Sequence, residues 1–164
     1  MCSKARQGVA SAEFSSPEDA AALVRQAHAL SQLGDGGPQL LQGKKFALVS
    51  PRRGEQGEGE FLRAATALGA HVSCVQLGLD ENSSAQQIAA TARVLARLYD
   101  AVECQHLPAA LVGQIARNST IPVFAGLATQ DHPTAALADA LGVDAPPALR
   151  RDAILQAALL LSLR

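Results

Sequence analysis

Short apolar runs alternate along the chain with longer segments in which apolar residues recur at helical spacing. Such runs are typical of buried strands, and they lie at residues 46–50, 71–77, 100–104 and 121–126. The helical spacing predicts helices over about residues 17–33, 59–68, 83–99, 107–119 and 132–142. Because strands that alternate with helices require right-handed crossovers, we predict an α/β fold with a parallel four-stranded sheet flanked by helices.

Several of the predicted helices begin at recognisable capping residues. Ser16 precedes Pro17, which suits the first helical position, and two acidic residues follow in the first turn. Ser83 or Ser84 is predicted to cap the helix after the second strand, and Pro133 lies in the first turn of the 132–142 segment. These capping residues support the predicted order of elements.

The chain divides into an N-terminal tail, one domain and a final helix, at residues 1–13, 14–145 and 146–164. A chain of 164 residues with 48% hydrophobic content can bury one substantial core, which favours a single domain. The final segment is apolar nearly all round over residues 153–163. This surface must therefore be covered by the domain itself or by another chain.

Composition excludes several classes of function. A net charge of -1 and 3% aromatic residues leave neither a basic surface nor a stacking platform, so we expect no nucleic-acid partner. No run approaches the roughly 18 apolar residues of a membrane span, and the first residues lack the apolar centre of a secretory signal. We therefore expect no membrane association and a cytoplasmic location.

The three cysteines, Cys2, Cys74 and Cys104, are too far apart to suggest a disulfide framework or a metal site. Cys74 and Cys104 lie in strand-like apolar runs, which favours buried thiols. No serine belongs to a motif that pairs it with a histidine, so covalent catalysis has no support. We expect no metal and no cofactor.

In parallel α/β folds, ligands bind beyond the carboxyl ends of the strands. In this chain the rule selects residues 50–60, 77–84, 104–107 and 125–134. Any binding site is therefore expected to be assembled from these four loops.

Several segments resemble, in order and spacing, the carbamoyl-phosphate-binding domain of the aspartate and ornithine carbamoyltransferases. The resemblance covers about residues 14–142 and rests most on TARVLARLYDAVE at 91–103 and GLATQDHPTAALAD at 126–139. It implies a Rossmann-like α/β domain that trimerises, with active sites between protomers. Family enzymes also have a second domain that binds the amino acid, and we expect this chain to end where that domain would begin.

The residues that bind the phosphate in the family are replaced here. The implied Ser-Thr-Arg-Thr-Arg turn after the first strand falls on Gly54, Glu55, Gln56, Gly57 and Glu58. A further family arginine, just past the third strand, falls on Gln105, and the last residue of the His-Pro-Thr-Gln motif is Ala135. The loop that reaches a neighbouring site in the family has no lysine here. The acids near the helix start can instead stabilise the helix dipole, which favours a turn that supplies its own anion.

Four residues remain as candidate ligand-binding groups. His132 and Thr134 keep part of the family motif, although both side chains can also serve the turn at a helix start. Arg52 and Arg53 are new relative to the family pattern. They can restore anion binding, or lie on the surface paired with Glu55 and Glu58, which we prefer.

Because all three arginines are lost together, we expect a stand-alone domain without independent catalysis that acts as a binding, regulatory or assembly protein. The alternative is a carbamoyltransferase subunit with an altered anion site built from the four candidate residues. A third possibility is a protein that inserts into a carbamoyltransferase trimer and modulates it. The expected partners are further copies of the chain in a trimer, a full-length carbamoyltransferase, and a small anion or amino acid.

Overall fold

The computed structural model describes residues 14, 16–33, 39–142 and 144–163. The predicted tail at 1–13, with Cys2, lies outside these residues. Four parallel strands form one sheet in the order β2-β1-β3-β4. They are β1 (Lys45–Val49), β2 (His71–Val75), β3 (Ala101–Cys104) and β4 (Val123–Ala125). The predicted fold class is therefore confirmed.

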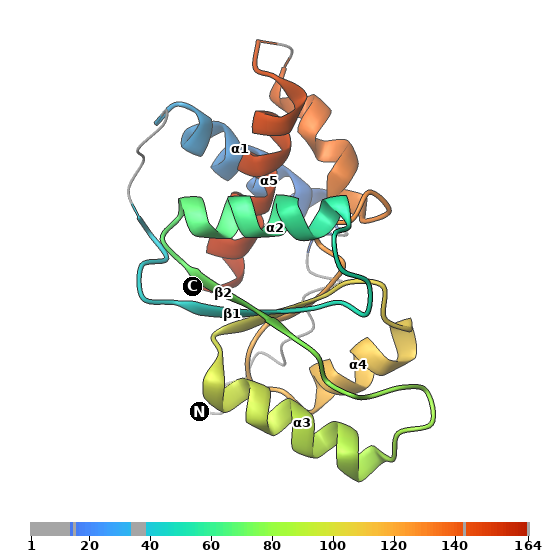
Figure 1. Cartoon of the computed structure of the whole chain (residues 1–164). Helices are drawn as coiled ribbons and strands as arrows, with labels where there is room; N and C mark the ends of the chain where they lie inside the picture. The colour runs from blue at the N-terminus through green and yellow to red at the C-terminus, as the bar shows by residue number, and fades with distance from the viewer. Residues whose placement is uncertain (1–13, 15, 34–38, 143, 164) are drawn as a thin grey trace, which may run out of the picture.

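Helices cover both faces of the sheet (Figure 1). One face carries α3 (Ala85–Leu98) and α4 (Ala109–Arg117). The other carries α2 (Gln56–Ala67), with α1 (Pro17–Ser31), the 3-10 helix η1 (Pro133–Leu141) and α5 (Pro147–Ser162) beyond it. The sheet therefore lies between a thin helical layer and a thick one.

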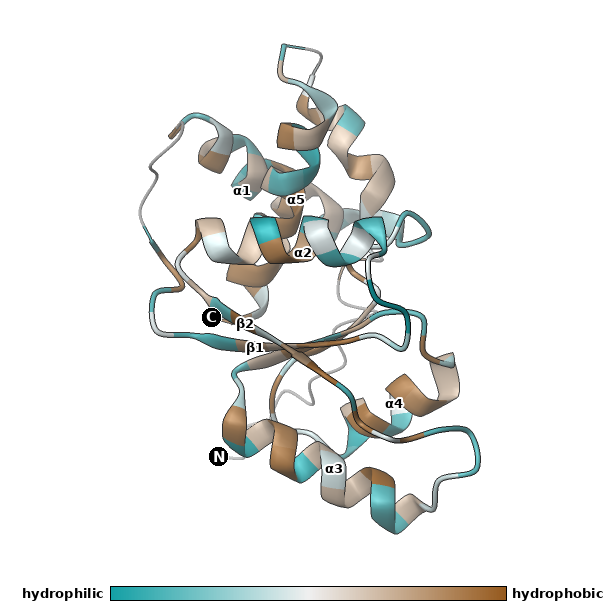
Figure 2. Ribbon diagram, viewed as in Figure 1, coloured by the Kyte–Doolittle hydropathy of each residue, from teal (hydrophilic) through white to brown (hydrophobic). Residues whose placement is uncertain are grey.

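The strand β1 contributes to the cores on both faces because successive side chains point to opposite sides. Phe46 and Leu48 belong to the core beneath α2 and α5, whereas Ala47 and Val49 belong to the core beneath α3 and α4. Figure 2 accordingly shows β1 as largely hydrophobic. The register places Val49 beside both Val75 and Cys104, so the carboxyl ends of the three strands lie level.

The predicted helix caps are present. Ser16 Oγ accepts a hydrogen bond from the Asp19 N–H, and Pro17 occupies the first turn of α1. Ser84, one of the two serines considered, caps α3 in a reciprocal arrangement with Gln87. Each such cap stabilises its helix by about 1 kcal/mol.

Two elements differ from the prediction. Helix α2 begins at Gln56 rather than near residue 59, because Gly54 adopts a positive φ of 83° and Glu55 takes the extended N-cap conformation. The 132–142 segment forms a 3-10 helix. Its first turn is set by an i to i+3 bond from the Ala135 N–H to His132 O, and its end by the bond from Gly142 to Asp139.

The two cysteines that the structure describes differ in exposure. Cys104 is buried, as predicted. Cys74 is exposed, contrary to the prediction, because it lies on the edge strand β2, where His71 and Ser73 are exposed as well. Edge position, which the local sequence does not encode, decides the difference.

The apolar final segment packs within the chain. Helix α5 contacts α1, α2 and η1, and its residues 151–155 and 157–160 are buried. Arg63 of α2 donates two hydrogen bonds to the Asp152 carboxylate, at 2.9 and 3.0 Å. The apolar surface of α5 is therefore covered by the domain itself, and this helix does not need another chain to cover it.

We expect Leu155→Ala to lower the free energy of unfolding by about 2 to 5 kcal/mol, because the side chain is fully buried and its loss leaves a cavity. Urea denaturation measures the change. Leu149→Ala is the matched control, since Leu149 is 55% exposed on the same helix and its loss should cost less than about 0.5 kcal/mol. Equal effects of the two substitutions would show that α5 is not packed as described.

Candidate functional site

The loops at the carboxyl edge of the sheet meet α5 in a group of polar side chains. We call this group the polar cluster; it consists of Glu60, Gln105, His132, Thr134 and Arg151, all of them buried. It lies on the α2 side of the sheet, around the start of α2. Four of its members lie in the loops that the sequence selected, and three of these, Gln105, His132 and Thr134, were named there individually. Glu60 and Arg151 were not proposed as site residues.

The start of α2 supplies its own carboxylate. The Gly54 N–H donates to Glu58 Oε2 at 2.8 Å, while the N-cap residue Glu55 makes no side-chain capping bond. A carboxylate at a helix N-terminus interacts favourably with the helix dipole. The turn therefore places the chain's own carboxylate just before the N-terminus of α2, where a helix can otherwise attract an anion.

The Gln105 side chain packs directly against this helix start and is fully buried. A Cβ atom at Gly57 would lie 3.2 Å from Gln105 Oε1, 3.3 Å from Nε2 and 3.1 Å from Ala128 O. Glycine at position 57 is therefore needed for this close approach. Neither polar atom of the Gln105 amide has a hydrogen-bond partner, which is costly for a buried group.

Glu60 places a second acid two residues further along α2. Its Oε1 accepts a hydrogen bond from Gln56 Nε2 at 2.8 Å. Its Oε2 lies 3.7 Å from Arg151 Nε, and neither of these two atoms has a hydrogen-bond partner. The pair is thus an ion pair without a direct hydrogen bond.

Arg151 extends from α5 into the cluster and donates to backbone and side-chain oxygens. Its Nη2 donates to Leu127 O at 2.9 Å and Thr129 O at 3.2 Å, and its Nη1 to Thr134 Oγ1 at 3.3 Å. Burial lowers the pKa of Arg151, and the nearby Glu60 and Glu103 carboxyls oppose that change. The guanidinium remains charged, as it does in proteins generally.

His132 and Thr134 are turned toward one another. The Thr134 N–H donates to His132 Nδ1 at 3.2 Å, and Thr134 Oγ1 lies 2.9 Å from the same nitrogen. Burial, and then the positive charge of Arg151, lower the pKa of His132 to about 4. His132 is therefore neutral at pH 7, and its Nδ1 holds the start of η1.

Glu103 of β3 is a buried acid that sequence reasoning did not select. Its carboxylate accepts hydrogen bonds from the N–H groups of Leu127 and Ala128, each at 2.9 Å. Burial raises the pKa of Glu103 to about 7, and these bonds offset part of that rise. The nearby Gln105 amide also lowers the pKa of Glu103, although the amide makes no hydrogen bond to the carboxylate.

The sequence carried a sign of only one of the three missed residues. Glu103 is the only charged residue inside the apolar strand AVEC. A charge inside an apolar strand is seldom buried unless it is paired, so position 103 called for a partner. Arg151 gave no such signal, because charged residues flank it on both sides at the start of α5.

The other candidate residues stay outside the polar cluster. Arg52 and Arg53 are exposed, and among the residues that the structure describes no ion pair joins either one to Glu55 or Glu58. The preferred pairing is therefore wrong: Glu58 is taken by the Gly54 N–H, and Glu55 is exposed in the N-cap position. Ala135 is half-buried in η1.

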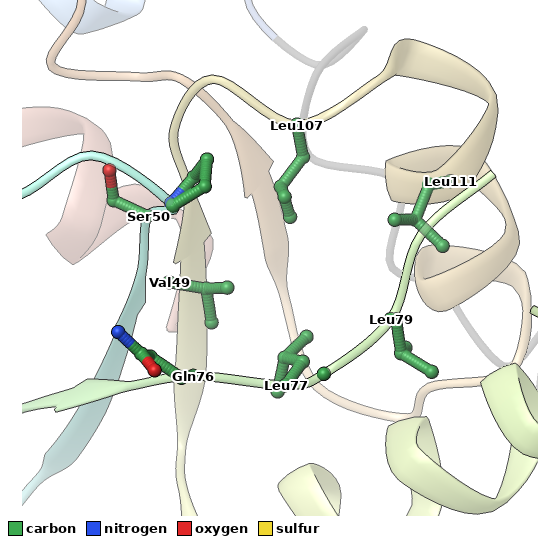
Figure 3. A pocket seen from close by; sticks show the side chains of 9 residues that line it. Val49, Ser50, Gln76, Leu77, Leu79, Leu107 and Leu111 are labelled. Atoms are coloured by element: carbon green, nitrogen blue, oxygen red, sulfur yellow. The ribbon is translucent and has the colours of Figure 1, made fainter.

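A separate cavity of about 290 Å³ opens on the α3 and α4 side of the same edge. Figure 3 shows apolar side chains around it, including Leu77, Leu79, Leu107 and Leu111, with Ser50 and Gln76 as its polar side chains. Three of the loops selected from the sequence contribute to its lining, but none of the individually named candidate residues does. Since it lacks charged groups, we place the candidate site at the polar cluster.

Within residues 14, 16–33, 39–142 and 144–163, no group of three or more His, Cys, Asp and Glu side chains could hold a metal ion. Over the same part of the chain, every helix is too short or too polar to cross a membrane.

The family model for aspartate/ornithine carbamoyltransferase, carbamoyl-P binding domain, matches residues 8–144. The chain belongs to this family. It is 36% identical over 103 residues to ornithine carbamoyltransferase from Actinobacillus pleuropneumoniae, covering 63% of this chain and 31% of that protein. It is 34% identical over 106 residues to the catabolic ornithine carbamoyltransferase of Mycoplasma capricolum subsp. capripneumoniae, covering 65% and 34%.

Solved structures of the family share the fold. Ornithine carbamoyltransferase from Pyrococcus furiosus superimposes with a TM-score of 0.67 at 25% identity, covering 86% of this chain and 46% of that one. Aspartate transcarbamoylase from Trypanosoma cruzi gives 0.62 at 25% identity, covering 82% and 44%. The chain thus spans about a third of the curated relatives it matches and under half of these solved chains.

We expect Glu103→Gln to change how stability depends on pH. A carboxyl whose pKa is raised from 4.5 to about 7 contributes stability that is full below pH 4.5 and is lost as pH rises through 7. Between these values the wild type should lose on the order of 3 kcal/mol relative to Glu103→Gln, measured by urea denaturation at each pH. His132 acts in the opposite direction but is present in both proteins.

Glu81→Gln is the control for this experiment, because Glu81 is an exposed acid in the loop after β2. Its profile should run parallel to that of the wild type. Parallel profiles for Glu103→Gln as well would contradict the raised pKa.

Proposed function

We propose that this carbamoyltransferase-family domain does not catalyse carbamoyl transfer by itself and acts as a binding, regulatory or assembly protein. One observation carries the proposal: the start of α2, on which the family's phosphate turn falls, is filled by the chain's own groups. Glu58 accepts the Gly54 N–H, and the Gln105 amide packs against Gly57. A phosphate would have to displace both.

The charges at this edge also disfavour an anion. The three arginine positions of the family are occupied by Gln56, Glu58 and Gln105. A charge-assisted hydrogen bond contributes roughly 1.5 to 3 kcal/mol, so three lost bonds amount to about 4 to 9 kcal/mol. This corresponds to roughly a thousand-fold to a million-fold in affinity, before repulsion by Glu58 and Glu60 is counted.

The remaining polar groups do not replace the lost ones. Arg151, the guanidinium inside the cluster, is already bonded to Leu127 O, Thr129 O and Thr134. His132 is neutral and bonded to Thr134. Since catalysis in the family, as the resemblance implies, depends on holding the phosphate and polarising the carbonyl, the rate should fall together with binding.

A second candidate function is a carbamoyltransferase subunit with an altered anion site. It is favoured by the two exposed guanidiniums of Arg52 and Arg53, which lie beside the Gly54 turn without an ion pair. In this case the anion would bind outside the polar cluster. The calorimetric experiment below distinguishes the two functions.

Isothermal titration with millimolar carbamoyl phosphate should show no saturable binding, because the Glu58 carboxylate lies at the turn before α2 and would repel the phosphate. The Actinobacillus pleuropneumoniae ornithine carbamoyltransferase serves as the binding control. Saturable binding near micromolar concentration that Arg52→Ala or Arg53→Ala abolishes would overturn the proposal in favour of the altered subunit.

We also propose that the domain self-associates, with a trimer as the favoured state, or joins a full-length carbamoyltransferase. Val94 and Leu98, one turn apart on α3, are 54% and 57% exposed and offer an apolar contact surface away from α5. Apolar residues grouped on one exposed face are common at protein interfaces.

Light scattering at tens of micromolar protein should therefore report a trimer, because burial of the Val94 and Leu98 face favours association. Val94→Glu should shift the population toward monomer. A monomer at this concentration for the unaltered chain would contradict the trimer.

A further inference from the structure

The groups around the Arg151 guanidinium are all acceptors or anions. Two are the backbone oxygens of Leu127 and Thr129, and the third is Thr134 Oγ1, at distances of 2.9, 3.2 and 3.3 Å. The fourth is Glu60 Oε2, 3.7 Å from Nε. None of these groups belongs to α5, so the arrangement is built by the rest of the domain.

The acceptors are spaced for a planar cation with several N–H groups. Nη2 spans two carbonyl oxygens at once, while Nη1 reaches the hydroxyl and Nε faces the carboxylate. A guanidinium presents five N–H donors in a fixed fork, whereas an ammonium is a compact point charge. The geometry therefore favours a guanidinium over other cations.

The site is enclosed: Glu60 and Arg151 are 8% and 7% exposed, and Thr134 is fully buried. Without the Arg151 guanidinium, the buried Glu60 carboxylate would lose its ion-pair partner, and the exposed Arg63 would attract it only at longer range. The Leu127 oxygen would lose the Arg151 donor, whereas the Thr129 oxygen would keep the His132 N–H. These groups should bind a guanidinium again if one is supplied.

We propose that the polar cluster is a guanidinium-binding site, which Arg151 fills from α5. The edge of the sheet on which the family's phosphate turn falls would then select a planar cation in place of an anion. The inference rests on the proposed function, since groups arranged to accept hydrogen bonds from a guanidinium repel a phosphate. The site also anchors α5. Among the described residues, Arg151 is the one member of the polar cluster that α5 contributes.

The neighbouring ion pair on α5 provides a matched control. Asp152 is bound by Arg63 with two hydrogen bonds, but the Arg63 side chain is 53% exposed. Removal of the Arg63 guanidinium therefore leaves a solvent-exposed space that water fills. Removal of the Arg151 guanidinium leaves a cavity enclosed by the protein.

The test is chemical rescue of Arg151→Ala by ethylguanidinium, which carries the atoms that the substitution removes from Cγ onward. Thermal unfolding is followed at low millimolar ligand, with ethylammonium in parallel. We expect Arg151→Ala to have a lower Tm than the wild type, and ethylguanidinium to raise it saturably by several degrees. Ethylammonium should raise it less, and neither ligand should raise the Tm of Arg63→Ala or the wild type.

Absence of saturable rescue, or equal stabilisation of Arg63→Ala, would overturn the site. If Arg151→Ala is unfolded, recovery of helical circular dichroism with ethylguanidinium supports the proposal. If the circular dichroism does not recover, the Tm of Arg151→Lys is compared with that of Arg63→Lys. A larger decrease for Arg151→Lys supports a site that requires the planar guanidinium. Equal decreases refute the site.

The result of the rescue experiment can be distinguished from the test of the proposed function. Carbamoyl phosphate is titrated into the unaltered chain in the same thermal assay. Its binding there would overturn the proposed function, whatever the rescue shows. Failed rescue without phosphate binding overturns the guanidinium site alone.

Discussion

The segment 127–129 is held from two sides by buried ionisable side chains, and the arrangement of the carboxyl edge depends on it. Glu103 of β3 accepts the N–H groups of Leu127 and Ala128, while Arg151 of α5 donates to the oxygens of Leu127 and Thr129. The segment leads from β4 into η1 and so positions His132 and Thr134. Because each charge is buried, loss of either would leave unpaired polar groups of the backbone.

The start of α2 carries two acids of its own. Glu58 accepts the Gly54 N–H just before the helix, and Glu60 adds a further negative charge two residues on. Such charges favour the helix itself. They also place carboxylates at the edge of the sheet, where the proposed function expects no phosphate to bind.

The two faces of the sheet give its carboxyl edge two different environments. The α3 and α4 side holds an apolar cavity without charged side chains, shown in Figure 3. The α2 and α5 side holds the buried acids and Arg151. The alternation of β1 residues between faces explains how neighbouring positions such as Leu48 and Val49 serve the two sides.

The sequence by itself determined the alternation of strands and helices, the Ser16 cap, a cap at Ser83 or Ser84, and the family. These features depend on local periodicity or on positions in a motif. Only the tertiary structure decided that Cys74 lies on an exposed edge and that α5 is covered within the chain. It also brought Arg151 to Glu60 and Glu103 to residues 127–128, because such pairs join elements far apart in the sequence and depend on how those elements pack.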